Sequence, residues 1–176
     1  MRPLRPDEIE VRIGQIYSGG CSMLLYKNAR VDMAVLDELY GPMGWQRDHK
    51  EVKGNMYCGI GIWDDKKACW VWKWDAGTES NTEKEKGEAS DSFKRAGTNW
   101  GIGRELYTSP FIWLEVATNS YQMNGRTYYK LNDARELRGI VVSHIKTEDI
   151  NGVLTITELD LTQKGHTVYH YERKDK

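Results

Sequence analysis

The sequence predicts an α+β fold with an antiparallel β-β-β-α core, a short N-terminal helix and a C-terminal β-meander. Three observations predict it: β-type segments near 45–53, 55–63 and 68–75 lie between turns, an apolar stripe at helical spacing follows them, and further β-type segments close the chain. The 176 residues are 39% hydrophobic and 29% charged. A chain of this size supports one core, so we expect a single domain over 1–176.

A strand and a short helix are expected before the predicted core. The apolar run from Met23 to Tyr26 follows Gly19-Gly20, which is typical of a strand after a turn. From Val31, apolar residues recur at intervals of three and four until Gly41-Pro42 ends the pattern. This spacing predicts an amphipathic helix over about 30–40.

The three core strands are separated by Gly54 and by the polar turn at 64–67. In the third strand, Trp70, Trp72 and Trp74 occupy alternate positions. Alternate residues of a strand point to the same side, so three indoles share one face of the sheet. We expect this face to pack on the helix that follows.

That helix is expected over about 82–103, beginning with a capping box formed by Thr82 and Glu85. Its apolar stripe consists of Ala89, Phe93, Ala96, Trp100 and Tyr107. A lane of small residues beside the stripe, which would let another chain approach closely, consists of Ser90, Gly97 and Gly101. Each glycine in a helix interior costs about 1 kcal/mol against alanine. We therefore expect a break at 101–103 that turns Arg104 outward.

The C-terminal part predicts a meander over 121–171, with strands near 127–131, 139–145, 152–161 and 166–171. A short apolar segment at 110–116 precedes it, and the charged tail at 172–176 is expected to fray.

Several functional classes are disfavoured by the residues. The three cysteines have no CxxC spacing, the histidines are scattered, and no phosphate-binding loop or nucleophile-base constellation is marked. We therefore expect no cofactor, no metal and no enzymatic activity. No apolar run approaches the roughly 20 residues of a membrane span, and the N-terminus has no signal core. A cytoplasmic protein without membrane contact is expected.

Nucleic-acid binding remains as the sharper hypothesis. A single strand needs cations along its backbone and flat apolar surface for its bases, and the net charge of −1 requires any such site to be local. Candidate cations are Lys94, Arg95 and Arg104 on or after the long helix, Lys66 and Lys67 in the turn, and Arg47, Lys50, Lys53 and Lys73 on the sheet. For each cation taken alone, an ordinary solvated charge is the simpler interpretation.

The run SDSFKRAGTNWGIGRELY at 90–107 resembles the signature helix of single-strand annealing proteins of the Rad-fifty-two superfamily, in particular the phage Sak type. Further blocks resemble that family in the same order: IEVRIGQ at 9–15, Gly19-Gly20, LLYKNAR at 24–30 and LDELYGPMGWQ at 36–46. The resemblance covers residues 8 to about 115. Gly97, Glu105 and the triple-tryptophan strand depart from the family pattern.

The resemblance implies single-stranded DNA binding and ATP-independent annealing of complementary strands, in homologous recombination or repair. It implies a homo-oligomer, as a ring or helical filament, and a single-strand binding protein or exonuclease as a further partner. Arg12, Lys94 and Arg95 match basic positions of the family's groove, Lys66 and Lys67 match a hairpin that forms an outer site, and Arg104 matches an arginine of binding or structural role. A phage-encoded protein of this type would act in the cytoplasm of its host bacterium.

Two alternatives stay open. The chain could be an interaction module that keeps the fold and binds another protein through its aromatic sheet. A metal-dependent nuclease using Asp64 and Asp65 is the other, although a polar turn of this composition is more often a solvated hairpin tip.

Overall fold

The computed structural model describes residues 1–77 and 84–174 and confirms the α+β class. The chain divides into two compact units, one formed by Met1–Pro3 with Lys27–Arg104 and the other by Leu4–Tyr26 with Glu105–Lys176. We call them the helical unit and the β unit. The prediction of a single domain over 1–176, with parts at 8–115 and 121–171, stays a prediction.

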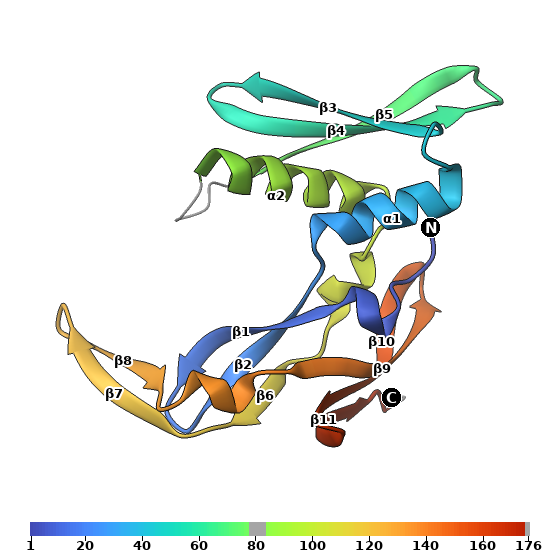
Figure 1. Cartoon of the computed structure of the whole chain (residues 1–176). Helices are drawn as coiled ribbons and strands as arrows, with labels where there is room; N and C mark the ends of the chain where they lie inside the picture. Colours follow the sequence, from blue (N-terminus) through green and yellow to red (C-terminus); the bar gives the residue numbers. More distant parts are fainter. Residues whose placement is uncertain (78–83, 175–176) are drawn as a thin grey trace. The chain divides into compact units, whose positions relative to one another are not determined.

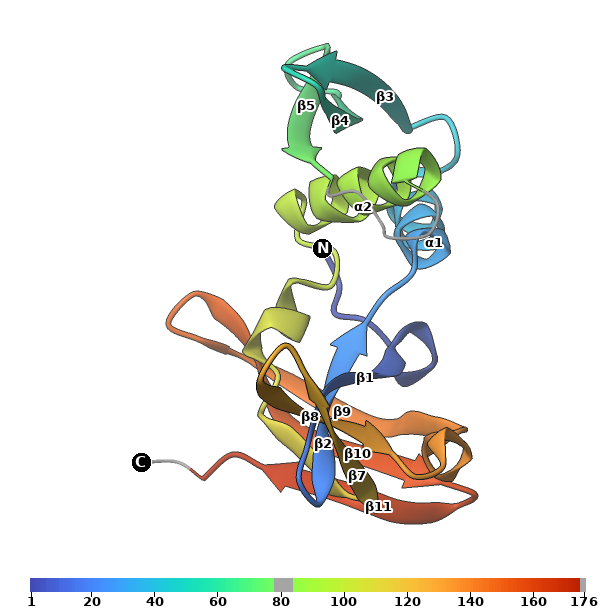
Figure 2. The same cartoon turned by 90° about the vertical axis from the view of Figure 1, so that its left-hand side faces the viewer.

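The helical unit contains the predicted β-β-β-α arrangement. Its elements are α1 (Ala29–Tyr40), β3 (Trp45–Val52), β4 (Asn55–Asp64), β5 (Cys69–Ala76) and α2 (Lys84–Asn99). The strands form one antiparallel sheet in the order β3-β4-β5. Figures 1 and 2 show α2 across one face of this sheet, with α1 beside α2. Most bounds agree with the sequence expectation to within one or two residues.

The two faces of the β3-β4-β5 sheet differ in composition. The inner face, covered by α2, carries the buried Cys58, Ile60 and Ile62 of β4, against Phe93 and Ala96 of α2. The outer tryptophan face, which we define as Trp63, Trp70, Trp72 and Trp74, lies on the opposite side. The expectation that the indoles pack on the long helix is therefore wrong.

Glycines in β4 explain this choice of face. Gly59 pairs with Trp74 and Gly61 pairs with Trp72. A Cβ atom on Gly59 would lie 2.5 Å from the Trp74 ring, and one on Gly61 would lie 2.9 Å from the Trp72 ring. The indoles thus lie flat over glycine backbone, whereas the alternate positions of β4 offer branched side chains to the helix.

Helix α2 ends at Asn99, four residues before the expected end near 103, and the predicted break follows it. Gly101 and Gly103 have φ values of +100° and +66°, which side chains other than glycine adopt only with strain. Arg104 is exposed beyond the break, as expected. The predicted capping box includes Thr82, which lies outside the described residues.

In its described residues, the β unit contains three separate antiparallel sheets. The first, in the order β1-β2-β6, consists of Glu10–Tyr17, Gly20–Tyr26 and Ile112–Glu115, and the second of β7 (Thr118–Met123) and β8 (Arg126–Leu131). The third is a C-terminal meander of β9 (Ile140–Ile150), β10 (Val153–Gln163) and β11 (His166–Glu172), whereas the predicted meander over 121–171 also included β8, which pairs in the second sheet. Its buried residues include Ile156, Leu159 and Leu161 of β10. Short 3-10 helices occupy Pro6–Glu8, Arg104–Thr108 and Ala134–Leu137.

Across residues 1–77 and 84–174, four hairpins are closed by the same two-residue turn, in which both residues have positive φ. The turns are Lys53-Gly54, Asn124-Gly125, Asn151-Gly152 and Lys164-Gly165. Positive φ at both central positions defines the type I′ turn, whose twist matches that of the flanking strands. In the described part of the chain, no helix combines the length and the apolar character that crossing a membrane requires.

Candidate nucleic-acid interface

The six predicted cations lie in different settings, and Arg12 is separate from the other five. It belongs to β1 of the β unit, whereas the other five belong to the helical unit. Its guanidinium pairs with Glu10, at 2.6 Å between Nη2 and Oε2, and lies 4.1 Å from the centroid of the Tyr26 ring. Arg12 is thus an exposed cation held over an aromatic ring.

Lys94 lies on the side of α2 that faces α1. Its side chain is only 15% exposed, and its Nζ lies 3.6 Å from the carboxylate of Asp91. Its carbonyl oxygen accepts a hydrogen bond from Nζ of Lys27 at 3.2 Å. Lys94 therefore belongs to the layer between the two helices.

A buried ion pair lies in that layer, between Lys27 just before α1 and Asp32 of α1, and Lys27 links it to α2 through the Lys94 carbonyl oxygen. Lys27 donates to Oδ1 of Asp32, and the two side chains are 7% and 0% exposed. Burial raises the pKa of Asp32 to about 6, although the charge of Lys27 opposes the rise. Among the described residues, Oδ2 of Asp32 has no hydrogen-bond partner. A Cβ on Gly97 would collide with Oδ1 of Asp32, so α1 of the same unit fills the predicted small-residue lane at that point.

Three cations converge where α2 ends. Arg95 lies 3.3 Å from Asp75 of β5, measured from Nε to Oδ1. Lys73 of β5 donates from Nζ to the carbonyl oxygen of Asn99 at 2.9 Å, and Arg104 donates to the same oxygen at 3.1 Å. Cations at this end of a helix interact favourably with its dipole. Arg104 therefore has the structural role that the sequence left open for it, alongside any role in binding.

The hairpin between β4 and β5 carries Lys66 and Lys67 at its tip. Oδ1 of Asp64 accepts hydrogen bonds from both lysine backbone N–H groups, and these bonds, that of Lys67 first, lower the pKa of Asp64. Asp65 accepts from Nε1 of Trp63 at 3.0 Å. The two aspartates thus organise the turn, and no group of three or more metal-ligating side chains occurs in the described residues.

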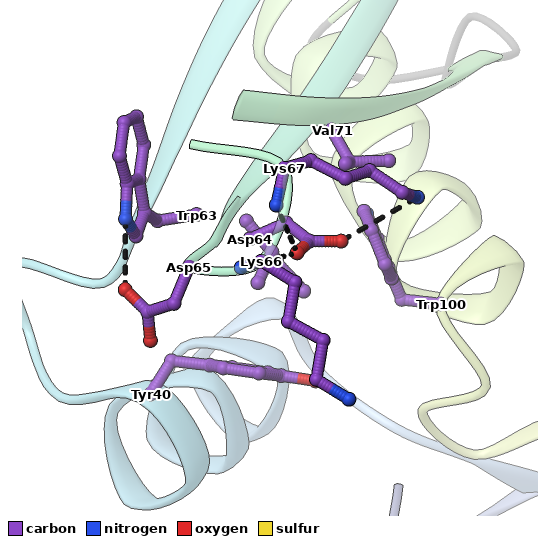
Figure 3. A pocket seen from close by; sticks show the side chains of 9 residues that line it. Tyr40, Trp63, Asp64, Asp65, Lys66, Lys67, Val71 and Trp100 are labelled. Atoms are coloured by element: carbon purple, nitrogen blue, oxygen red, sulfur yellow. Dashed lines mark hydrogen bonds and ion pairs between the residues drawn. The ribbon is translucent and has the colours of Figure 1, made fainter. Parts of the chain in front are cut away.

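A pocket of about 460 Å³ lies under this tip (Figure 3). Its walls are Tyr40 of α1, Trp100 just after α2, and Ile62 and Val71 of the sheet, while the tip residues form its rim. In Figure 3, Lys66 points toward Tyr40, and Lys67 points toward Asp64 and the Trp100 side.

Trp100 connects the pocket to the cations at the end of α2. Nε1 of Trp100 donates to the carbonyl oxygen of Ile60 at 2.9 Å, which fixes the ring against the sheet. Nζ of Lys73 lies 4.4 Å from the centroid of the same ring. Five cations therefore follow the β5 side of the helical unit; we call them the edge cluster, and they are Lys66, Lys67, Lys73, Arg95 and Arg104.

Four of the six predicted site residues fall in the edge cluster, and Lys94 and Arg12 do not. Sequence reasoning considered Lys73 only among the cations of the sheet, and it assigned Trp100 to the buried stripe. The missing signal was the pairing register, which sets Lys73 opposite Ile60, the residue whose carbonyl holds Trp100. Tyr40 as a pocket wall had no signal in the sequence. The chain was compared with protein-family models, curated proteins and solved structures, and none of them matched.

Proposed function

We propose that this protein binds single-stranded DNA and anneals complementary strands without nucleotide hydrolysis, in homologous recombination or repair. The observation that carries the proposal is the edge cluster around Trp100. It combines cations for a phosphate backbone with a fixed aromatic ring, which are the two features that a single strand needs. Positions 69–75 of β5 span roughly 20 Å at about 3.3 Å per residue, so the cluster extends over several nucleotides.

The charges of the edge cluster are only partly compensated. Five cations face three carboxylates, Asp64, Asp65 and Asp75. Among the described residues, the Lys66 ammonium has no ion-pair partner. Because the whole chain has a net charge of −1, binding would depend on this local excess and not on bulk charge.

The proposal includes assembly and partners. A homo-oligomer, as a ring or helical filament, would bring the edge clusters of successive copies along one strand, and a single-strand binding protein or exonuclease would supply or process that strand. Lys94 and Arg12 stay predictions as phosphate contacts, Arg12 from the β unit.

Annealing is tested with two complementary oligonucleotides at low salt, without nucleotide or added metal. The protein should accelerate duplex formation, and its affinity for one strand should fall steeply with salt, because each phosphate contact releases counterions. For the variant Lys66→Ala with Lys67→Ala, we expect the slope of log affinity against log salt to fall by about 0.7, the contribution of one phosphate contact, because Lys67 is already paired with Asp64. An annealing rate equal to that of the oligonucleotides alone would contradict the proposal.

The matched control removes two other cations of the helical unit, Arg30 and Lys50, by Arg30→Ala with Lys50→Ala. Both lie outside the edge cluster. If this variant lowers the salt slope as much as the lysine pair does, binding follows net charge and the edge cluster is not the interface.

A protein-interaction module is the second candidate, and the outer tryptophan face favours it. Trp72 and Trp74 are stacked with centroids 5.6 Å apart, and Trp63 is 40% exposed. The charged residues on this face, Asp48 and Lys50, form an ion pair at 3.7 Å, so the face carries no excess charge for phosphate. Exposed tryptophans with few charges are typical of protein interfaces.

Replacement of Trp72 by serine separates the two candidates. Loss of a partner protein or of the oligomer with unchanged strand binding would support the module, measured by sedimentation and by fluorescence anisotropy of a labelled oligonucleotide. Loss of strand binding with unchanged assembly would place the strand on the outer tryptophan face.

A further inference from the structure

The pocket under the β4-β5 hairpin has walls and a rim of different chemistry. Its walls are two aromatic rings, Tyr40 and Trp100, and two aliphatic side chains, Ile62 and Val71 (Figure 3). Its rim carries the two lysines Lys66 and Lys67 together with the two aspartates Asp64 and Asp65. Such a pocket suits a flat apolar group that is attached to an anion.

The two aromatic walls are held in different ways. Trp100 is fixed by its hydrogen bond to the carbonyl oxygen of Ile60 and by the Lys73 ammonium near its ring. Tyr40 is in the last turn of α1 and is 39% exposed. One wall is therefore preformed, and the other lies at the open side where a ligand would enter.

The charges at the rim are mostly compensated, so the pocket does not favour a bare anion. Oδ1 of Asp64 is occupied by two backbone N–H groups, and its Oδ2 lies 3.4 Å from Nζ of Lys67. The Lys67 charge is thus largely compensated, whereas the Lys66 charge has no ion-pair partner among the described residues. The Asp65 carboxylate also lines the rim, where it accepts from Nε1 of Trp63. Lys66 is therefore the rim ammonium that is left to meet a phosphate, beside a mainly apolar cavity that matches one base.

We propose that the pocket holds one unstacked nucleobase of the bound strand, between Tyr40 and Trp100, with the adjoining phosphate at Lys66. This inference rests on the proposed function, because it assigns part of the strand to a place in the edge cluster. A volume of about 460 Å³ lies within the range of small-molecule sites, which is about 300 to 1,000 Å³. Stacking on aromatic rings accepts every base, so the site would not select a sequence.

A base in this pocket is withheld from pairing. Its role is to fix the position of the strand on the protein while neighbouring bases remain available to a complementary strand. The edge cluster contacts phosphates, and the pocket therefore adds a contact to a base.

The experiment compares two oligonucleotides of equal length. One consists of thymidine nucleotides, and the other consists of abasic nucleotides, in which a hydrogen atom stands in place of each base. Their phosphate charge is the same, so the ratio of the two affinities isolates contacts to bases. We expect the wild-type chain to prefer the thymidine strand by roughly ten-fold or more, in line with the contribution of a stacked base. Two variants change the pocket without changing charge: Tyr40→Ala removes a wall, and Val71→Trp fills the cavity.

Both variants should reduce the preference several-fold while affinity for the abasic strand stays unchanged. Met43→Ala is the matched control, since Met43 is 89% exposed and does not line the pocket. Circular dichroism checks that each variant is folded. A preference that survives in a folded Tyr40→Ala or Val71→Trp chain overturns the base pocket and leaves the proposed function in place. If the wild-type chain binds neither strand at low salt, the proposed function itself fails.

Discussion

The inner and outer faces of the β3-β4-β5 sheet are both rich in large apolar side chains, yet among the described residues a helix of the helical unit covers only the inner face. The inner face places Ile60 and Cys58, both with no exposed surface, against α2. The outer tryptophan face has a larger ring area and keeps Trp63 40% exposed. The amount of apolar surface therefore did not decide which face α2 covers.

The shape of the side chains on β4, the strand next to β5, decided which face α2 covers. Glycines of β4 lie beneath the indoles on one side, and branched aliphatic residues project from the same strand on the other. Branched side chains interdigitate with a helix surface, whereas flat rings on a glycine backbone form a level surface that offers a helix few holes. The covered face stabilises the unit, and the level face is the one that the second candidate function would use.

The largest expected effect comes from the covered face. Ile60→Ala should lower the free energy of unfolding by about 4 kcal/mol, because a fully buried isoleucine leaves a cavity under α2. Urea denaturation measures the loss. Trp63→Ala on the outer tryptophan face is the comparison, and we expect it to lose less than half as much. Equal losses would mean that the two faces contribute alike to stability.

The next effect is a pH dependence of the free energy of unfolding, which arises from Asp32 in the layer between α1 and α2. Burial raises the pKa of Asp32 from 3.8 to about 6, so between these values the folded chain holds a proton that the unfolded chain has released. The free energy of unfolding should therefore fall as pH rises from about 4 to 6, by up to about 3 kcal/mol at 1.36 kcal/mol per pH unit.

The variant Asp32→Asn isolates this contribution. Subtracting its unfolding free energy from that of the wild type at each pH cancels the other titrating groups, such as His170, whose pKa is raised by its hydrogen bond with Asp160. The difference should decline between pH 4 and 6 and level off above. Parallel profiles would show that Asp32 titrates at its ordinary value.

The smallest effect tests the glycine support of the outer tryptophan face. Gly59→Ala places a Cβ 2.5 Å from the Trp74 ring, so the indole must swing outward and lose its stacking on Trp72. We expect a loss of about 1 kcal/mol, near the lower end for overpacking, because the Trp74 ring is only half-buried and the Lys50 side chain over it is flexible. Near-ultraviolet circular dichroism should report the displaced indole.

A double-mutant cycle sharpens this test. In a Trp74→Ala background, Gly59→Ala has no ring to displace and should be close to neutral. If Gly59→Ala destabilises both backgrounds equally, its effect comes from the backbone and the glycine does not serve the indole.

Much of the fold could be predicted from local signals. Gly101 and Gly103 predicted a break, although α2 already ends at Asn99, and the turns around Gly54 and Gly152 predicted strand bounds, because these features act within a few residues. The covered face of the sheet could not be predicted from β5 alone. Alternation separates the two faces of a strand, but the choice between them depended on Gly59 and Gly61 in the neighbouring strand.

The candidate site shows the same division. The sequence located Lys66, Lys67, Arg95 and Arg104 as cations, but their grouping depends on contacts across β5 and the end of α2. Lys94 and Arg95 are neighbours in sequence and face different surroundings, because adjacent helix residues point about 100° apart. Lys73 and Tyr40 joined the site only through tertiary structure.

The four type I′ turns also bear on how the chain folds. Each joins strands that are adjacent in sequence, so β3-β4, β7-β8, β9-β10 and β10-β11 can pair as local hairpins within microseconds. The pairing of β2 with β6 is different, since it pairs Gly20 with Glu115, and residues 27–104 of the helical unit lie between them in the sequence. Contacts so distant in sequence form slowly. We therefore expect hairpins to form first and the β1-β2-β6 sheet to be completed last.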